Sequence, residues 1–367
     1  MSVPRVLCIV LAGGQGSRLG PLTLGRAKPS LPVGGNYRLI DVSLSNAMHS
    51  GLTDVWVPQQ YEPHVLNEHL ADALARNWPL IAAFDPDVLL VCSADHLFKL
   101  DYRDVITRHL DAGADATLVA TSMPRGSDLT RYLLVDSRDG TVRSVDYKPD
   151  EPKGRTVGTE VFAYRPDRLY GALRELRDQG GDLGDYGERL LPLMVDQGTV
   201  AEFEHRGHWR DLGTPEAYLD CQLQLLADRP PLSMDDPGWP FITSMPVRAP
   251  AKVHRTAEID RAWLSPGADV AGTVVDSIIG PGVRIEPGAE VRHSVLMSDV
   301  VVRSGAQVAR SVLAEHVVVG RSARVGTANA KHPALIGVRR RVPGGQVIGA
   351  GEELEPRRPR DILGSAR

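Results

Sequence analysis

Residues 6–29 read VLCIVLAGGQGSRLGPLTLGRAKP, an apolar run that passes directly into a glycine-rich loop. The run Val6-Leu7-Cys8-Ile9-Val10 has the length and composition of a buried strand. Glycines carry no Cβ, so the loop can turn sharply and its backbone can approach a ligand closely. Free amides in such a loop favour an anion, above all where a helix begins nearby. The stretch therefore predicts an anion site after the first strand, formed by Gly13, Gly14 and Gly16.

Two cations belong to the same stretch. Arg18 offers a planar guanidinium and Lys28 a compact ammonium group, and two cations beside free amides suit a triphosphate. The loop has neither the GxxxxGK[ST] pattern of a P-loop nor the GxGxxG spacing of a dinucleotide-binding fold. Glycines after a first strand also make plain tight turns, so the loop alone favours a phosphate site without excluding a turn.

Length, composition and charge limit the class of protein. A chain of 367 residues is long enough for two domains of roughly 100–200 residues each. No apolar run reaches the ~18 residues of a membrane span, and no secretory leader pattern opens the chain. A net charge of −4 argues against a nucleic-acid binder. The run Arg339-Arg340-Arg341 is interpreted as a solvated edge rather than an anion site.

Three cysteines, Cys8, Cys92 and Cys221, lie far apart in the chain. Two of them fall inside strand-like runs, where a reduced and buried thiol is the ordinary state. Their number and placement favour a cytoplasmic protein without disulfides.

Up to about residue 225, short β-rich runs alternate with helical patterns. This alternation predicts a Rossmann-like, mostly parallel sheet with helices on both faces. In open sheets of this kind the ligand lies beyond the carboxyl ends of the strands, where the glycine loop also falls. The predicted strands after the first one are 55–57, 87–92, 117–121 and 161–164, and the predicted helices include 102–112 and 165–176.

A proline-rich linker and a repeat follow. Proline density over residues 226–250 opposes both helix and sheet, which divides the chain into domains 1–225 and 251–367. In the second domain Ser277, Ser294 and Ser311 recur every 17 residues, and apolar residues recur every six. The six-residue step predicts a left-handed parallel β-helix of hexapeptide repeats, with three short strands to a coil. Stacking of neighbouring coils supplies its stability.

A hexapeptide β-helix by itself also fits an acyltransferase, which needs an activated histidine. His293, His316 and His332 are present, but the residues around them indicate no activated site. We interpret them as surface histidines.

The complete motif set resembles one enzyme family. The glycine loop with Arg18 and Lys28-Pro29 resembles the GGxGxRL…KP motif of the sugar-nucleotide pyrophosphorylases. Tyr37-Arg38-Leu39-Ile40-Asp41, Leu44-Ser45-Asn46 and Ser50-Gly51 narrow the resemblance to the bacterial ADP-glucose pyrophosphorylases. This resemblance spans nearly the whole chain, from the nucleotidyltransferase domain to the β-helix.

The resemblance implies an Mg²⁺-dependent transfer of a nucleotidyl group from ATP to glucose 1-phosphate, as in glycogen biosynthesis, by a homotetramer assembled through its β-helix. Ser93-Ala94-Asp95-His96 is similar to the family's (S)GDH motif and Trp209–Thr214 to its WRDVGT motif, which makes Asp95 and Asp211 the metal ligands. The remaining implied residues are Arg18 and Lys28 for catalysis, Leu11, Ala12, Gly13, Gly14, Gly16 and Gln60 for the nucleotide, and Lys148, Glu160 and Asp185 for the sugar phosphate.

The chain departs from the family pattern at four places. Tyr147 stands where the family has a glutamate before the lysine, and Leu133 and Glu160 each stand where it has a glycine. The segment that would contain a base-contacting Gly-Thr is missing, because the chain runs from His69-Leu70 straight into Ala71. These departures leave two alternatives open: another nucleoside triphosphate or hexose 1-phosphate as substrate, or a non-catalytic regulatory homologue.

Overall fold

The computed structural model describes residues 3–13, 16–58, 70–180, 183–245 and 247–357. The chain divides into two compact units that do not follow chain order. Unit 1 consists of Met1–Gly14 and Val42–Trp209, and unit 2 consists of Gln15–Asp41 and Arg210–Arg367. The segment with Arg18 and Lys28 therefore belongs to the same unit as the β-helix, whereas the predicted domain boundaries place it in the first domain.

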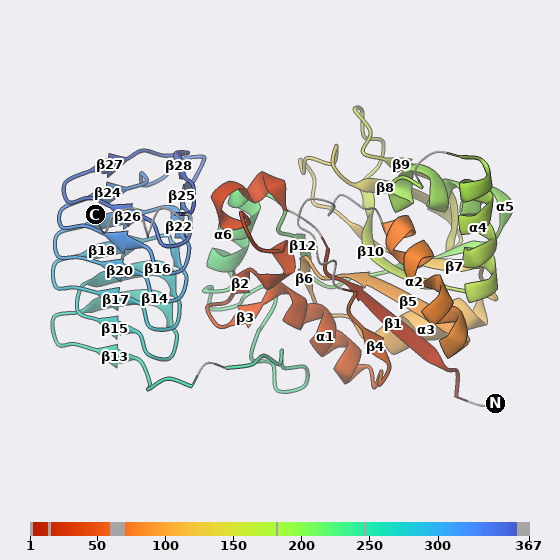
Figure 1. Cartoon of the computed structure of the whole chain (residues 1–367), viewed down its shortest axis with the longest axis horizontal. Coiled ribbons are helices and arrows are strands. Elements are labelled where there is room, and N and C mark those ends of the chain that lie inside the picture. The colour runs from red at the N-terminus through yellow and green to blue at the C-terminus, as the bar shows by residue number, and fades with distance from the viewer. Residues whose placement is uncertain (1–2, 14–15, 59–69, 181–182, 246, 358–367) are drawn as a thin grey trace, which may run out of the picture. The chain divides into compact units, whose positions relative to one another are not determined.

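Unit 1 is built on an eight-stranded sheet flanked by helices (Figure 1). Strands β4, β1, β5, β7 and β11 run in the same direction, and β10 runs opposite to its neighbours β5 and β7. The predicted α/β fold is confirmed, with an antiparallel strand inserted into its parallel part. In spatial order the strands are β4 (Val55–Trp56), β1 (Val6–Leu11), β5 (Val88–Ser93), β10 (Thr156–Tyr164), β7 (Ala116–Ser122), β11 (Val200–Glu204), β9 (Thr141–Tyr147) and β8 (Leu133–Arg138).

Apolar side chains on both faces of the sheet are buried against helices. On one face, Leu7 and Ile9 of β1 join a core to which α2, α4 and α5 contribute. On the other face, the buried thiols of Cys8 and Cys92 lie 3.9 Å apart, beside the buried ring of Tyr102 from α3. The prediction of buried thiols in the two strand-like runs is confirmed for Cys8 and Cys92, and Cys221 is buried as well. The helices are α2 (Leu70–Phe84), α3 (Tyr102–Asp111), α4 (Pro166–Asp178), α5 (Leu191–Gln197) and the short π-helix η3 (Tyr186–Leu190).

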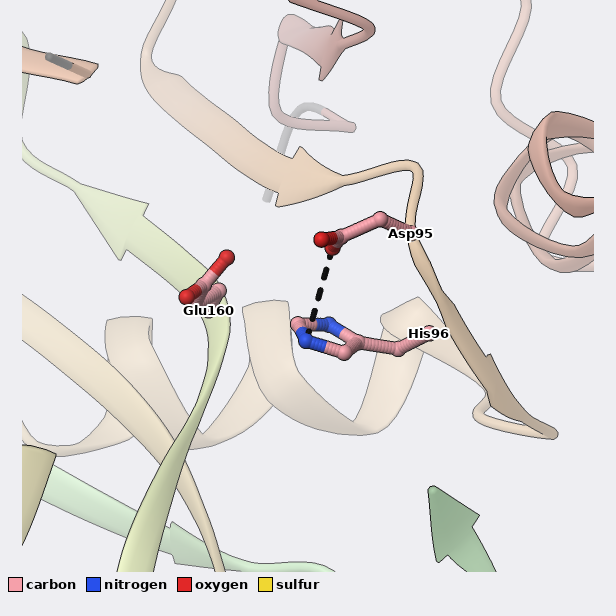
Figure 2. Close-up of side chains that lie close together, drawn as sticks. All are labelled: Asp95, His96 and Glu160. Atoms are coloured by element: carbon pink, nitrogen blue, oxygen red, sulfur yellow. Dashed lines mark ion pairs between the residues drawn. The ribbon is translucent and has the colours of Figure 1, made fainter. Parts of the chain in front are cut away.

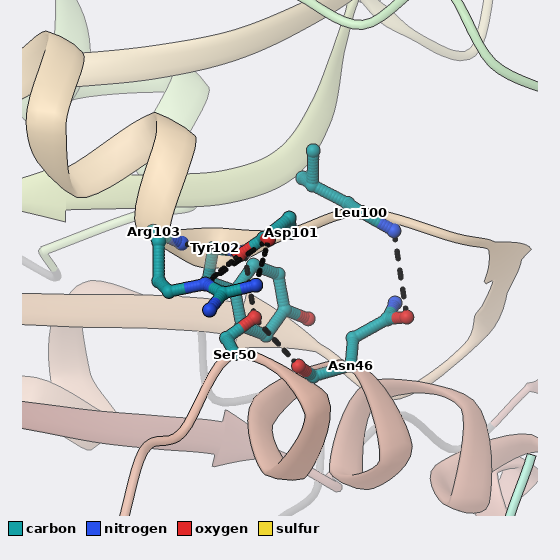
Figure 3. A network of polar contacts seen from close by, with 6 residues as sticks. All are labelled: Asn46, Ser50, Leu100, Asp101, Tyr102 and Arg103. Atoms are coloured by element: carbon teal, nitrogen blue, oxygen red, sulfur yellow. Dashed lines mark hydrogen bonds and ion pairs between the residues drawn. The ribbon is translucent and has the colours of Figure 1, made fainter. Parts of the chain in front are cut away.

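A polar network fixes the chain that leads into α3 (Figure 3). Asn46 and Ser50, from the end of α1 (Leu39–His49) and the turn after it, are buried. The backbone amide of Leu100 donates to Asn46 Oδ1 at 3.4 Å, and that of Tyr102 donates to Ser50 Oγ at 2.7 Å. Asp101 caps α3 by accepting from the amide of Arg103. Two residues of the family-like motif therefore have a structural role, holding the start of α3.

Unit 2 contains the parallel β-helix, in which three stacks of short strands enclose a buried core (Figure 1). The predicted repeat is confirmed, because Val270, Ile285 and Val302 stack in register and are buried. The first stack contains β13 (Lys252–Val253), β15 (Asp269–Val270), β17 (Arg284–Ile285), β20 (Val301–Val302), β23 (Val318–Val319) and β26 (Arg341–Val342). The second and third stacks both start from the long strands β14 (Glu258–Leu264) and β16 (Thr273–Ile279). The second stack continues through β18 (Glu290–Arg292), β21 (Gln307–Ala309), β24 (Arg324–Val325) and β27 (Val347–Ile348). The third stack continues through β19 (Val295–Leu296), β22 (Ser311–Leu313), β25 (Ala334–Ile336) and β28 (Glu353–Leu354).

The repeated serines form a ladder inside the β-helix. The amide of Ser294 donates to Ser277 Oγ and the amide of Ser311 donates to Ser294 Oγ, both at 3.1 Å. All three serines are completely buried. A small hydroxyl at this position satisfies a backbone donor of the next coil, which explains why the 17-residue repeat keeps serine there.

The rest of unit 2 packs on the β-helix. It comprises the 3-10 helices η1 (Ser17–Leu22) and η2 (Lys28–Ser30), the hairpin β2 (Pro32–Val33) and β3 (Tyr37–Arg38), and α6 (Pro215–Gln224). Between α6 and β13 the described residues form no helix or strand, in keeping with the proline content of residues 226–250. Among the described residues, no helix combines the length and apolarity needed to cross a membrane.

Candidate active site

The glycine loop follows β1 at the carboxyl edge of the unit 1 sheet. Leu11 pairs with Ser93 at the end of the neighbouring parallel strand β5, and the amide of Ala94 donates to the carbonyl of Leu11 at 3.1 Å. Two adjacent parallel strands therefore end side by side, with Ala12 and Gly13 following β1 and Asp95 following β5. This is the edge of the sheet at which the sequence predicts the ligand. Gly14 and Gln60, two of the predicted nucleotide-binding residues, lie outside the described residues.

In unit 2 the two predicted cations meet one predicted metal ligand. Lys28 Nζ donates to Asp211 Oδ1 at 3.1 Å, and both side chains are more than 90 % buried. A Cβ placed on Gly213 would come within 3.0 Å of the Asp211 carboxylate and 3.3 Å of the Arg18 guanidinium. Gly213 thus permits the close approach of Arg18 to Asp211. Two cations and one carboxylate leave a net positive charge, which suits an anionic ligand.

Gly16 supports this arrangement through its backbone. It has φ +61°, and a Cβ there would lie 3.0 Å from Lys28 Cβ. The Thr23 hydroxyl donates to the carbonyl of Gly16 at 2.9 Å, which closes the loop that contains Arg18. A larger residue at position 16 would be strained by its φ and would push against Lys28.

A second cluster in unit 1 joins Asp95, His96 and Glu160 (Figure 2). One ligand atom from each lies within 4.8 Å of the other two, and His96 Nε2 is 3.4 Å from Asp95 Oδ1. Ser93 Oγ donates to Asp95 Oδ1 at 2.5 Å and helps to orient the carboxylate. Two carboxylates and an imidazole at this spacing can ligate a divalent cation after small side-chain rotations, so the residues present fit a metal.

Glu160 adopts a conformation that side chains rarely take. Its φ is +58°, at an irregularity in the pairing of β10 with β7 between Gly158 and Phe162. The Tyr186 hydroxyl donates to Glu160 Oε1 at 3.4 Å. A glutamate with this φ costs about 1 kcal/mol relative to glycine, and such strain is found most often at functional positions.

Lys148, Asp185 and Tyr147 form a third group, also in unit 1. Lys148 Nζ lies 3.5 Å from Asp185 Oδ2 and 4.2 Å from the centre of the Tyr147 ring. The Tyr147 hydroxyl donates to the same carboxylate oxygen, and burial together with the Asp185 charge raises the pKa of Tyr147. A Cβ on Gly187 would collide with the Tyr147 ring. Tyr147 therefore occupies part of the predicted sugar-phosphate site and holds Asp185 beside Lys148.

The other departures from the family pattern have different consequences. Leu133 is buried, and a Cβ on Gly158 would lie 3.1 Å from its side chain, so it fills the core beside β10. At the position where the family's long segment is missing, α2 begins at Leu70. His293, His316 and His332 have side chains about half exposed, as expected for surface histidines.

Sequence reasoning did not assign a role to two residues that the structure places at these groups. His96 is buried against the Trp209 ring with centroids 4.9 Å apart and contributes to the Asp95 cluster. Tyr186 is buried and contacts Glu160. The dipeptide Asp95-His96 directly after a buried strand is the signal for His96, and the signal for Tyr186 is the stretch Asp185-Tyr186-Gly187, which resembles a DFG-like motif of the family.

Comparisons with known proteins agree on the two parts of the chain. Residues 7–75 and 69–228 match the family model for nucleotidyl transferases, and residues 250–360 match the model for GlmU-like C-terminal hexapeptides. The two stretches of the first match overlap at residues 69–75, the place at which the family's long segment is missing from the sequence.

Curated relatives extend over most of the chain. It is 34 % identical over 360 residues to a glucose-1-phosphate adenylyltransferase of Frankia casuarinae, covering 82 % of this chain and 87 % of the relative. It is also similar to proteins of the same description from Thermotoga neapolitana, at 32 % identity (78 % of this chain, 76 % of the relative), and Clostridium perfringens, at 30 % identity (81 % and 85 %). Each match covers at least 78 % of this chain, which is more than the sheet region or the hexapeptide region contains alone, so each relative matches part of both.

Proposed function

Because this chain belongs to the glucose-1-phosphate adenylyltransferase family of nucleotidyl transferases, we propose that it transfers the adenylyl group of ATP to glucose 1-phosphate. A phosphate oxygen of the sugar phosphate attacks the α-phosphorus of ATP, the bond to the bridging oxygen breaks, and pyrophosphate leaves with its electron pair. The products are ADP-glucose and pyrophosphate. ADP-glucose is the glucosyl donor for α-glucan synthesis. The nucleophile is already an anion, so alignment and charge neutralisation suffice and no general base is needed.

One observation carries this proposal beyond the family assignment: Arg18, Lys28 and Asp211 meet in unit 2. We assign Arg18 and Lys28 to the triphosphate, whose negative charge grows on the leaving pyrophosphate. The burial of Lys28 beside Asp211 lowers the local dielectric and strengthens its attraction for phosphate oxygens. Leu11, Ala12 and the glycines Gly13, Gly14 and Gly16 are assigned to the nucleotide, and Gln60 to the base.

Nucleotidyl transferases of this kind use a divalent metal ion, and we propose Mg²⁺ with Asp95 and Asp211 among its ligands. When bound, the ion neutralises phosphate charge during transfer. Asp95 is held for this task by the hydroxyl of Ser93. Asp211 is oriented by Lys28, whose Nζ donates to its Oδ1.

The sugar-phosphate side is assigned to Lys148, Asp185 and Glu160. Lys148 is the cation for the phosphate of the sugar, and it exchanges its contact with Asp185 for a contact with substrate. Glu160 and Asp185 offer carboxylate acceptors for sugar hydroxyls. The Tyr147 hydroxyl bound to Asp185 and the glutamate at position 160 favour a second candidate, a related hexose 1-phosphate as the acceptor.

We also propose that the chain assembles as a homo-oligomer, with a tetramer as the expected state. The hexapeptide β-helix supports this, since proteins of this architecture associate through such helices. The cytoplasmic location expected from the sequence stays a prediction.

The test is pyrophosphate release by the full chain in the presence of Mg²⁺, with each nucleoside triphosphate paired with glucose 1-phosphate and with other hexose 1-phosphates. We expect turnover with ATP and glucose 1-phosphate, and its loss in Asp95→Asn with the circular dichroism spectrum unchanged. Turnover confined to another pair would establish the second candidate. A folded protein inactive with every pair would instead point to a regulatory homologue.

A further inference from the structure

Arg26 lies between the two helical turns that contain the proposed triphosphate-binding cations. The turn η1, which includes Arg18, ends at Leu22, and Arg26 Nε donates to the carbonyl of Leu22 at 2.7 Å. The turn η2 begins two residues after Arg26, with Lys28 as its first residue. Any displacement of Arg26 therefore moves the ends of both turns.

The guanidinium of Arg26 is bonded to the β-helix within the same compact unit. Its Nη1 donates to Glu315 Oε1 at 2.5 Å, and its Nη2 donates to the sulfur of Met297 at 3.2 Å. Met297 follows β19, and Glu315 lies between β22 and β23, so one side chain contacts successive coils of the β-helix. A second contact lies at Gly20 of η1, where the Glu353 carboxylate of β28 leaves no room for a Cβ.

This ion pair differs from the Arg303–Glu286 pair of the β-helix in the burial of its arginine, because the two carboxylates are almost equally exposed. The side chains of Arg26 and Glu315 are 18 % and 20 % exposed, against 48 % and 22 % for Arg303 and Glu286. Within the part of the chain that the structure describes, Glu315 Oε2 is buried and has no hydrogen-bond donor. Arg26 is therefore the charged partner of a largely buried carboxylate, and the loss of either member of such a pair leaves the other charge uncompensated.

We propose that Glu315 is a positioning residue for the triphosphate site, acting through Arg26 on the segment that contains Arg18 and Lys28. The proposal rests on the proposed function, because the cations it positions are those assigned there to ATP. By this route the β-helix determines how well the loop is ordered for the nucleotide, although Glu315 itself contacts no substrate.

The test compares Glu315→Gln with Glu286→Gln, a matched control whose carboxylate pairs with Arg303 inside the β-helix. For Glu315→Gln we expect the ATP dissociation constant from calorimetry to rise about tenfold, the scale of one charge-assisted bond. The KM for the sugar phosphate should stay within about twofold. Amide hydrogen exchange over residues 16–31 should accelerate in Glu315→Gln and remain unchanged in Glu286→Gln.

A double-mutant cycle tests the route through Arg26. If Glu315 acts through Arg26, Glu315→Gln should add nothing to the effect of Arg26→Gln, so the two changes are strongly non-additive. Additive effects, or exchange over residues 16–31 that is identical in wild type and Glu315→Gln, would overturn the proposal. Hydrogen exchange needs no substrate, so a failure of the proposed activity is told apart from a failure of this coupling.

Discussion

At the scale of single residues, the positions where this chain departs from its family have taken on contacts of their own. Tyr147 donates to Asp185 and packs against the backbone at Gly187, and Glu160 accepts from Tyr186. Both residues therefore make specific hydrogen bonds in addition to packing contacts. The substituted positions on the proposed sugar-phosphate side are therefore part of the hydrogen-bonded structure of unit 1.

Glu160 provides the sharpest prediction at this scale. Because its φ of +58° suits glycine, Glu160→Gly should raise the free energy of unfolding by up to about 1 kcal/mol, measured by urea denaturation. The same change removes a carboxylate from the Asp95 cluster, so Mn²⁺ binding measured by calorimetry should weaken about tenfold.

The matched variant Glu160→Gln separates the two effects. It keeps the strained backbone and loses only the charge, so its stability should stay near that of the wild type while its Mn²⁺ affinity falls. If both variants bound Mn²⁺ as tightly as the wild type, Glu160 would have no part in the metal site.

At the scale of elements, short strands are held in place by groups that recur with the repeat. Each β-helix strand is only two or three residues long over most of the stack, so side-chain hydrogen bonds to the backbone contribute much of its definition. The serine ladder is the clearest instance, since Ser294 accepts from the amide of Ser311 and donates to the carbonyl of Arg292.

Removal of the middle hydroxyl should be costly. Ser294→Ala leaves a buried amide without its acceptor, so we expect a loss of about 1–3 kcal/mol in the free energy of unfolding. The half-buried Ser304, whose hydroxyl contacts Glu286 at 3.2 Å, provides the control, and Ser304→Ala should cost less than 1 kcal/mol. If urea denaturation gave the same loss in the free energy of unfolding for both variants, the serine ladder would contribute no more to stability than the hydroxyl of Ser304.

At the scale of the whole molecule, the residues to which functions are assigned are divided between the two compact units. Asp95, Lys148 and Glu160 belong to unit 1, and Arg18, Lys28 and Asp211 belong to unit 2 together with the β-helix. The segment Gln15–Asp41 is early in the chain but packs on α6 and the β-helix. One example is Gly34, whose amide donates to Gln222 Oε1 at 3.1 Å.

The proposed oligomer is tested at this scale. Size-exclusion chromatography with light scattering should give four times the 39.8 kDa mass of one chain, independent of concentration over the micromolar range. A stable monomer at high concentration would rule out assembly through the β-helix. A mass of two chains would support self-association but contradict the expected tetramer.

The sequence by itself determined those features that depend on local pattern. The apolar run Val6–Val10 predicted β1, the six-residue step predicted the β-helix, and the residues around the glycine loop, Asp95 and Asp211 predicted the nucleotidyl transferase family. The strand and the β-helix are readable because burial imposes a fixed period on a strand or coil, whereas the family is indicated by the resemblance of several motifs taken together.

Tertiary structure alone decided which distant residues meet. The inserted strand β10, the pairing of Lys28 with Asp211 and the bond from Arg26 to Glu315 join residues far apart in the chain. The same holds for the grouping of residues 15–41 with the β-helix. These contacts depend on how whole elements pack. The free energy of that packing is shared among many apolar contacts, none of which leaves a local signal in the sequence.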